Sequence, residues 1–208
     1  MSTKIKFCGL TRARDIEAAN RLMPEFIGFV FVPNSKRCVS PDLADVFRRM
    51  LDPGISAVGV FMNDEPSFIV ELVKAGIIDA VQLHGGEDRN YISKLKAKID
   101  RPVIKSFRIR TADDIERVKN CPADYILLDT GADSGKQLDW SMLTDPGRQF
   151  ILAGGLTPEN VGIAIERIRP FGVDVSSGIE TGGYKDAAKM TDFAEAVRNA
   201  DRQAEVSG

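Results

Sequence analysis

Residues 150–180 read FILAGGLTPENVGIAIERIRPFGVDVSSGIE, and this stretch decides the fold. Two apolar runs, at 150–153 and 172–175, each end in small residues. These are Gly154 and Gly155 after the first run, and Ser176, Ser177 and Gly178 after the second. Small residues let backbone N–H groups approach an anion, and the helix that begins near Thr157-Pro158 adds a favourable field. Two such turns late in a chain predict the phosphate site that follows strands seven and eight of a (β/α)8 barrel.

The same alternation of apolar strand and helix runs through the rest of the chain. Six earlier strands are expected at Lys4–Cys8, Phe26–Val32, Ser56–Phe61, Ala80–Leu83, Pro102–Phe107 and Tyr125–Asp129. Helices are expected at Thr11–Leu22, Ser40–Leu51, Asn63–Ala75, Glu87–Ala97, Thr111–Lys119, from Leu138, and at Asp186–Ala200. Continuously apolar strands indicate a parallel sheet covered on both faces, and eight units favour a closed barrel over an open sheet. We expect a single-domain α/β chain, residues 1–208, with only the tail 201–208 frayed.

The amino-acid composition of the chain argues against several classes of function. Lys and Arg number 28 against 30 Asp and Glu, and a net charge of −2 argues against a nucleic-acid or anionic-membrane partner. No apolar run approaches the roughly 20 residues of a membrane span, and the first residues lack the apolar region of a signal peptide. Three cysteines without metal-ligand spacing fit a reducing cytoplasm, and one histidine excludes a multi-histidine metal site. We therefore expect a cytoplasmic chain with a small-molecule substrate and no metal.

Two strand ends carry side chains suited to proton transfer. Cys8 ends the first strand, where it is either a small buried hydrophobe or, as a thiolate, a base or nucleophile. Asp129 ends the sixth strand after four apolar residues, so burial is expected to keep its carboxyl neutral, the form that a general acid needs. The alternative for Asp129 is a carboxylate that orders the following loop. Facing each other across a barrel mouth beside a phosphate site, the pair indicates proton shuttling on a sugar phosphate.

Other polar residues at strand ends are candidates for binding. The planar fork of Arg37 suits a carboxylate or phosphate, unless it is an ordinary solvated cation like its neighbour Lys36. Gln82 and His84 lie at the end of the fourth strand, where His84 either contacts a substrate or caps the next helix. Asp174 either binds a substrate hydroxyl or secures the Ser-Ser-Gly turn.

These residues resemble the phosphoribosylanthranilate isomerases of tryptophan biosynthesis. The matching segments occur in the family's order: 6–11 (KFCGLT), 35–37 (SKR), 58–61 (VGVF), 82–85 (QLHG), 128–130 (LDT), 138–140 (LDW), 152–156 (LAGGL) with 158–161 (PENV), and 173–180 (VDVSSGIE). The CGLT and DVSSG elements are specific together. Together, the matching segments cover nearly all the predicted strand ends.

The resemblance implies a cofactor-free Amadori rearrangement of N-(5-phosphoribosyl)anthranilate to 1-(2-carboxyphenylamino)-1-deoxyribulose 5-phosphate. By motif position, Asp129 is the general acid that opens the furanose ring, and Cys8 is the general base that removes the proton from C2. Arg37 pairs with the anthranilate carboxylate. The turns at Gly154-Gly155 and Ser176–Gly178 hold the phosphate, and the chain acts as a monomer or homodimer.

Two departures from the family pattern bear on the loop after Asp129. Ala132, Asp133 and Ser134 replace part of a Gly-Gly-Thr-Gly run, and Leu138 replaces a Phe. A carboxylate at Asp133 is unfavourable near a phosphate, so we expect it to point to solvent or the loop to shift. Asp139-Trp140 is interpreted as a helix cap followed by a core side chain.

Other functions remain as alternatives. One is the isomerase of the related histidine-pathway aminoaldose, alone or with dual specificity, but that barrel type uses paired aspartates and two phosphate sites. The other is a barrel that binds a phosphorylated ligand and has lost catalysis, which would predict an altered Cys8 or Asp129. Both residues are present.

Overall fold

The structure is a computed structural model that describes residues 2–109, 113–131 and 146–206. Eight parallel strands form a closed barrel in sequence order. They are β1 (Lys4–Cys8), β2 (Phe26–Val30), β3 (Ser56–Phe61), β4 (Ala80–Leu83), β5 (Val103–Arg108), β6 (Tyr125–Asp129), β7 (Phe150–Ala153) and β8 (Gly172–Val175). The pairing of β1 with β8 closes the barrel, which confirms the predicted (β/α)8 architecture.

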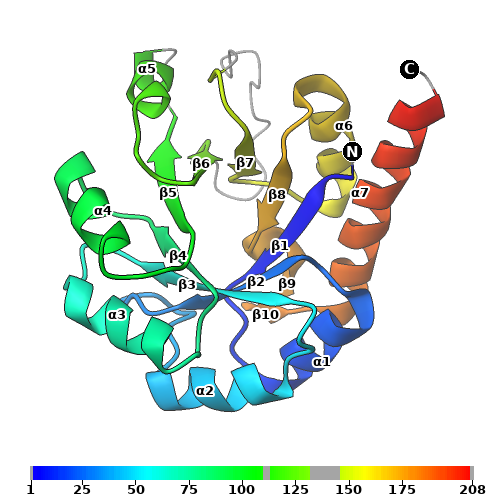
Figure 1. Cartoon of the computed structure of the whole chain (residues 1–208). Helices are drawn as coiled ribbons and strands as arrows, with labels where there is room; N and C mark the ends of the chain where they lie inside the picture. Colours follow the sequence, from blue (N-terminus) through cyan, green and yellow to red (C-terminus); the bar gives the residue numbers. More distant parts are fainter. Residues whose placement is uncertain (1, 110–112, 132–145, 207–208) are drawn as a thin grey trace.

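Helices surround the barrel (Figure 1). They are α1 (Ala13–Leu22), α2 (Pro41–Met50), α3 (Pro66–Lys74), α4 (Arg89–Lys96), α5 (Asp113–Lys119), α6 (Pro158–Ile168) and α7 (Ala187–Val206). Three predictions fall outside the described residues. They are the helix from Leu138, the interpretation of Asp139-Trp140, and the position of the variant loop residues Ala132, Asp133 and Ser134. Across the described ranges, every helix is too short or too polar to cross a membrane.

Local sequence signals set several helix starts. The Ser40 hydroxyl accepts a hydrogen bond from the Leu43 N–H, and the Asp88 carboxylate accepts one from the Tyr91 N–H. Each bond satisfies a backbone donor that a helix leaves free at its first turn. Proline opens α2, α3 and α6, where its missing N–H costs nothing. These helices therefore start within a few residues of their predicted positions.

The inside of the barrel changes from apolar to polar along the strands. One buried cluster groups Val58, Ala80, Ile104, Leu127 and Ile151, each from a different strand. Side chains two residues apart on a strand share a face, so residues such as Gln82 and Asp129 follow these apolar ones on the inner face. The apolar cluster fills the barrel, and polar side chains gather at the carboxyl ends of the strands.

Two segments near the end of the chain were not predicted. A short 3-10 turn, η2 (Ser177–Ile179), leads into a hairpin of β9 (Glu180–Thr181) and β10 (Tyr184–Lys185). The hairpin lies between β8 and α7 in the sequence. It carries two charged residues near the barrel mouth, Glu180 and Lys185.

The expectation of a frayed tail at 201–208 is wrong through Val206, because α7 continues to that residue. Asp201 explains the extension. Its Oδ2 accepts a hydrogen bond from the Thr3 N–H at 2.8 Å and its Oδ1 accepts one from the Thr3 hydroxyl at 2.6 Å. The last helix is thereby tied to the start of β1, and the two run close together in Figure 1.

We expect Asp201→Ala to lower the free energy of unfolding by about 1–3 kcal/mol, because it leaves the partly buried Thr3 donors without their acceptor. Glu195→Ala, at an exposed position of the same helix, is the matched control and should change stability by less than about 0.5 kcal/mol. Urea unfolding followed by circular dichroism measures both. Equal stability of the two variants would show that the tail contributes nothing to the fold.

Candidate active site

Cys8 lies at the carboxyl end of β1 with 8% of its surface exposed. Burial raises the pKa of its thiol, the nearby ammonium groups of Lys6 and Lys185 lower it, and the net shift is upward. Cys8 packs beside Val30 and Val60, the inward side chains of the next two strands. The thiol therefore sits in an apolar setting with positive charge close by.

Asp129 lies at the end of β6 beside the only histidine in the sequence. The Gly131 N–H donates to its Oδ1 at 2.8 Å, and His84 Nε2 lies 3.6 Å from its Oδ2. The side chain of Asp129 is 24% exposed, and burial alone would raise its pKa. His84, the Gly131 N–H and the charge of Arg108 lower the pKa by more. The expectation that burial keeps this carboxyl neutral is therefore wrong for the substrate-free barrel.

Gln82 orients His84. Gln82 is 1% exposed, and its Nε2 lies 3.3 Å from His84 Nδ1. If the amide donates, Nδ1 is the acceptor and Nε2 carries the proton, directed at Asp129. Gln82 Oε1 is buried and lacks a hydrogen-bond partner among the described residues. These side chains from β4 and β6 form one side of the mouth.

Arg37 belongs to the opposite side and is not a free loop cation. Its Nε and Nη2 donate to Glu180 Oε1 and Oε2 at 2.6 and 2.8 Å. Lys185 donates to the same Oε1 at 2.6 Å and to the Ser176 carbonyl at 2.9 Å, with only 1% of its side chain exposed. The bonds to Glu180 raise the pKa of Arg37, so its guanidinium remains charged. One carboxylate thus holds two cations beside Cys8.

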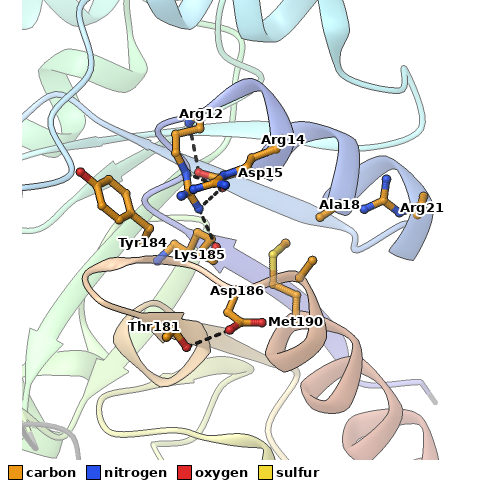
Figure 2. Close-up of a pocket in the computed structure, with 11 residues that line it drawn as sticks. Arg12, Arg14, Asp15, Ala18, Arg21, Thr181, Tyr184, Lys185, Asp186 and Met190 are labelled. Carbon is orange, nitrogen blue, oxygen red and sulfur yellow. Dashed lines mark hydrogen bonds and ion pairs between the residues drawn. The ribbon is translucent and has the colours of Figure 1, made fainter.

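The hairpin that carries Lys185 is braced from outside (Figure 2). The Arg12 guanidinium pairs with Asp15 at 2.7 Å and donates to the Lys185 carbonyl at 2.5 Å. It also lies over the ring of Tyr184, 4.6 Å from its centroid. These side chains line a surface cavity of about 360 Å³ between α1 and the start of α7. Arg12 therefore fixes the backbone of β10 while Lys185 points toward Glu180.

The two small-residue turns pack against each other. A Cβ on Gly178 would lie 1.9 Å from the Leu156 carbonyl oxygen, so only glycine allows the turn after β8 to approach the turn after β7 this closely. Gly154 and Gly155 both have positive φ, and a Cβ on Gly154 would lie 2.6 Å from Asp129 Oδ1. Asn160 holds the first turn by donating to the Gly155 carbonyl at 2.9 Å. Both turns thus lie at the same edge of the mouth.

Ser176 and Ser177 differ in their surroundings. The Ser176 hydroxyl donates to the Cys8 carbonyl at 3.0 Å and accepts from Lys185 at 3.2 Å, so it secures the end of β1. Ser177 is exposed at the start of η2. An anion at this turn would therefore meet the Ser177 hydroxyl and backbone N–H groups rather than the Ser176 hydroxyl.

Asp174 lies deeper than its predicted neighbours. It is 8% exposed, and Lys6 donates to its Oδ1 at 3.0 Å inside the barrel. The predicted site residues thus form two groups. Cys8, Arg37, Asp174 and the Ser-Ser-Gly turn lie in or just after β1, β2 and β8, whereas Gln82, His84, Asp129 and the Gly-Gly turn lie in or just after β4, β6 and β7.

A cavity of about 570 Å³ opens beside Asp129, between the ends of β4, β5 and β6. Lys105 and Glu87 line it as an ion pair of 2.9 Å whose side chains are 6% and 1% exposed. Among the described residues, His, Cys, Asp and Glu do not gather in groups of three that could hold a metal ion.

Sequence reasoning missed three charged residues at the mouth. Lys6 alternates with Cys8 on β1, so the period of the strand could have placed it inside the barrel. Glu180 and Lys185 belong to the hairpin, whose two-residue Gly182-Gly183 turn is a local signal that could have identified it. Their positions depend on contacts with Arg37 and Arg12 from distant parts of the chain.

The fold and the residues at its mouth define a (β/α)8-barrel enzyme with titratable side chains at the carboxyl ends of its strands. The profile of the family described as N-(5'phosphoribosyl)anthranilate (PRA) isomerase matches residues 5–196. The chain belongs to this family.

Individual relatives agree over their whole lengths. An N-(5'-phosphoribosyl)anthranilate isomerase of Acetivibrio thermocellus is 40% identical, with 96% of this chain and 97% of the relative covered. A crystal structure of a phosphoribosyl anthranilate isomerase in complex with reduced 1-(o-carboxyphenylamino)-1-deoxyribulose 5-phosphate superposes with a TM-score of 0.85 at 37% identity, covering 95% and 99% of the two chains. A structure of monomers generated from the dimeric Thermotoga maritima isomerase has the same score, identity and coverage.

We expect Gly178→Ala to cost about 1–3 kcal/mol of stability, because the added carbon must displace the Leu156 carbonyl and so part the two turns. Gly162→Ala is the matched control, since its Cβ would meet only the Ala196 carbonyl at 4.0 Å and α6 should gain up to about 1 kcal/mol. Thermal unfolding measures both changes. A Gly178→Ala variant as stable as the parent would contradict the close packing of the turns.

Proposed function

We propose that this chain converts N-(5-phosphoribosyl)anthranilate to 1-(2-carboxyphenylamino)-1-deoxyribulose 5-phosphate, the Amadori rearrangement of tryptophan biosynthesis. The observation that carries the proposal is the family match over residues 5–196 together with Cys8 and Asp129 at the mouth of one barrel. The reaction moves protons within one molecule, so it balances without a redox or metal cofactor.

Asp129 is the proposed general acid. It protonates the furanose ring oxygen, the ring opens, and a Schiff base forms between C1 and the anthranilate nitrogen. The surroundings of Asp129 lower its pKa, which favours the carboxylate. The substrate brings a phosphate and a carboxylate, and negative charge near a carboxyl favours the neutral form that the acid needs.

Cys8 is the proposed general base. Its thiolate takes the proton from C2 of the Schiff base and leaves an enolamine, which tautomerises to the ketone. The active forms are the thiolate of Cys8 and the neutral carboxyl of Asp129. Because the pKa of the acid is lowered and the pKa of the thiol is raised, kcat/KM is expected to be flat between the two pKa values and to fall above the pKa of the thiol.

The remaining predicted residues bind the substrate in this proposal. Arg37, oriented by Glu180, presents its remaining nitrogen to the anthranilate carboxylate. The Gly154-Gly155 and Ser176–Gly178 turns hold the phosphate through backbone N–H groups and the Ser177 hydroxyl. Gln82 and His84 bind the substrate from the other side of the mouth, with Gln82 Oε1, which lacks a partner among the described residues, as the acceptor for a substrate hydroxyl. Asp174 contributes to substrate binding indirectly, from beneath the mouth.

The alternative isomerase of the histidine pathway fits less well. Paired aspartates are the expected acid–base set there, whereas β1 ends here in Cys8. We also propose a cytoplasmic site of action, in keeping with three free cysteines, and action as a monomer or homodimer without nucleic-acid partners. The dimeric Thermotoga maritima relative favours the homodimer.

The first test is the loss of anthranilate-type fluorescence when the protein meets freshly generated phosphoribosylanthranilate. The parent should consume it rapidly, whereas Asp129→Asn and Cys8→Ser should each lose at least about a hundredfold in kcat, because each removes one proton-transfer group. Circular dichroism of both variants controls for folding. Normal turnover by either folded variant would refute its assignment.

Arg37→Ala should raise KM about ten- to a hundredfold with a smaller effect on kcat, because it removes a charge-assisted bond to the substrate carboxylate. Lys36→Ala, at the exposed neighbouring position, is the matched control and should leave KM unchanged. Steady-state kinetics on the same substrate measures the KM of both variants. Equal KM values for the two variants would mean that Arg37 serves only to hold Glu180.

A further inference from the structure

A charged pair lies inside the barrel beneath Cys8, and the reaction as described so far does not use it. Lys6 and Asp174 face each other across the strand pair that closes the barrel, and their side chains are 1% and 8% exposed. Burying two charges carries a desolvation penalty, and apolar side chains of similar size often stabilise a core as well or better. Stability alone therefore does not explain why the barrel encloses a lysine.

The position of Lys6 relative to the thiol suggests an explanation. Lys6 and Cys8 are two residues apart on β1, so both side chains point into the barrel. Opposite them on β2, a Cβ on Gly28 would lie 2.8 Å from Cys8 Sγ and 3.2 Å from Lys6 Nζ. The sulfur and the ammonium therefore border the same small space, which the missing side chain of Gly28 leaves open.

We propose that Lys6 is a positioning residue for catalysis, whose buried ammonium stabilises the Cys8 thiolate, while Asp174 keeps that ammonium charged and directed toward the sulfur. This inference rests on the proposed role of Cys8 as the general base. It assigns Asp174 to the support of Lys6 rather than to direct contact with the substrate.

Two other cations lie near Cys8 and share one carboxylate. Lys185 from β10 and Arg37 from the loop after β2 both bond to Glu180, which compensates part of their charge. Among the charges near Cys8, Lys6 lowers the pKa of the thiol most, whereas Asp174 raises it. Burial would lower the pKa of Lys6 itself, but Asp174 and Cys8 raise it by more, so Lys6 stays protonated. Lys6 is therefore the main source of positive charge for the thiolate.

The test is an ultraviolet titration of the thiolate, in which the Cys8 signal is the difference between each protein and its Cys8→Ser counterpart. Lys6→Met should raise the pKa of the thiol by at least about one unit. At neutral pH its kcat/KM should fall at least about tenfold. Asp174→Asn should shift the thiol pKa less than Lys6→Met does, because it removes a negative charge near the thiol and also the partner that keeps the Lys6 ammonium charged.

The double variant Lys6→Met/Asp174→Asn removes both buried charges, and so keeps the test open if Lys6→Met does not fold. Its thiol pKa should exceed that of Asp174→Asn alone. Equal thiol pKa values in that comparison would overturn the inference. Failure of the parent to consume phosphoribosylanthranilate would refute the proposed function instead, since the titration requires no substrate.

Discussion

The register between the first and last strands is the constraint on which the barrel and its mouth both depend. It pairs Lys6 with Asp174 and Phe7 with Val175. Side chains alternate between the two faces of a strand, so a slip of one residue would bring Phe7 inside and turn Cys8 outward. The Lys6–Asp174 ion pair favours the correct register, because in the slipped arrangement neither charge would have its partner. The same closure sets the Ser176 hydroxyl against the Cys8 carbonyl, so the interaction that completes the fold also locates the thiol.

The sequence predicts the order and the ends of the strands because these features are local. Apolar runs, N-terminal caps and small-residue turns each depend on a few consecutive residues. The positions of the candidate site residues are then predicted from the ends of the strands. The Gly182-Gly183 turn of the β9–β10 hairpin is also a local signal, but where the hairpin packs is not. Its placement involves Arg12 bonding to the Lys185 carbonyl, and the end of α7 is held by Asp201 bonding to Thr3. In both contacts the partner lies more than a hundred residues away, and no local pattern signals the contact.

The charge state of Asp129 also could not be predicted from local sequence. Its position after an apolar strand correctly indicates burial, and burial taken alone favours the neutral acid. The net effect reverses because a histidine from β4, an N–H from the next turn and an arginine from β5 all converge on the carboxylate. A strand end in a barrel has neighbours on both sides, so its electrostatics are a property of several strands at once. In the proposed reaction, an anionic substrate beside Asp129 would therefore have to favour its neutral form.

The two sides of the mouth therefore differ in their balance of positive and negative charge. On the side of β1 and β8, three cations face two carboxylates, since Lys6 is matched by Asp174 while Arg37 and Lys185 share Glu180. The surplus positive charge lies where an anionic substrate and a thiolate would both be stabilised. On the side of β4 and β6, the charged or titratable groups that lower the pKa of Asp129 among the described residues are His84 and the exposed Arg108. Negative charge bound between the two sides would raise the pKa of Asp129 without removing the cations that lie beside Cys8. If Asp129 and Cys8 act as the proposed acid and base, this asymmetry lets one anionic substrate favour the neutral acid while the base keeps a positive neighbour.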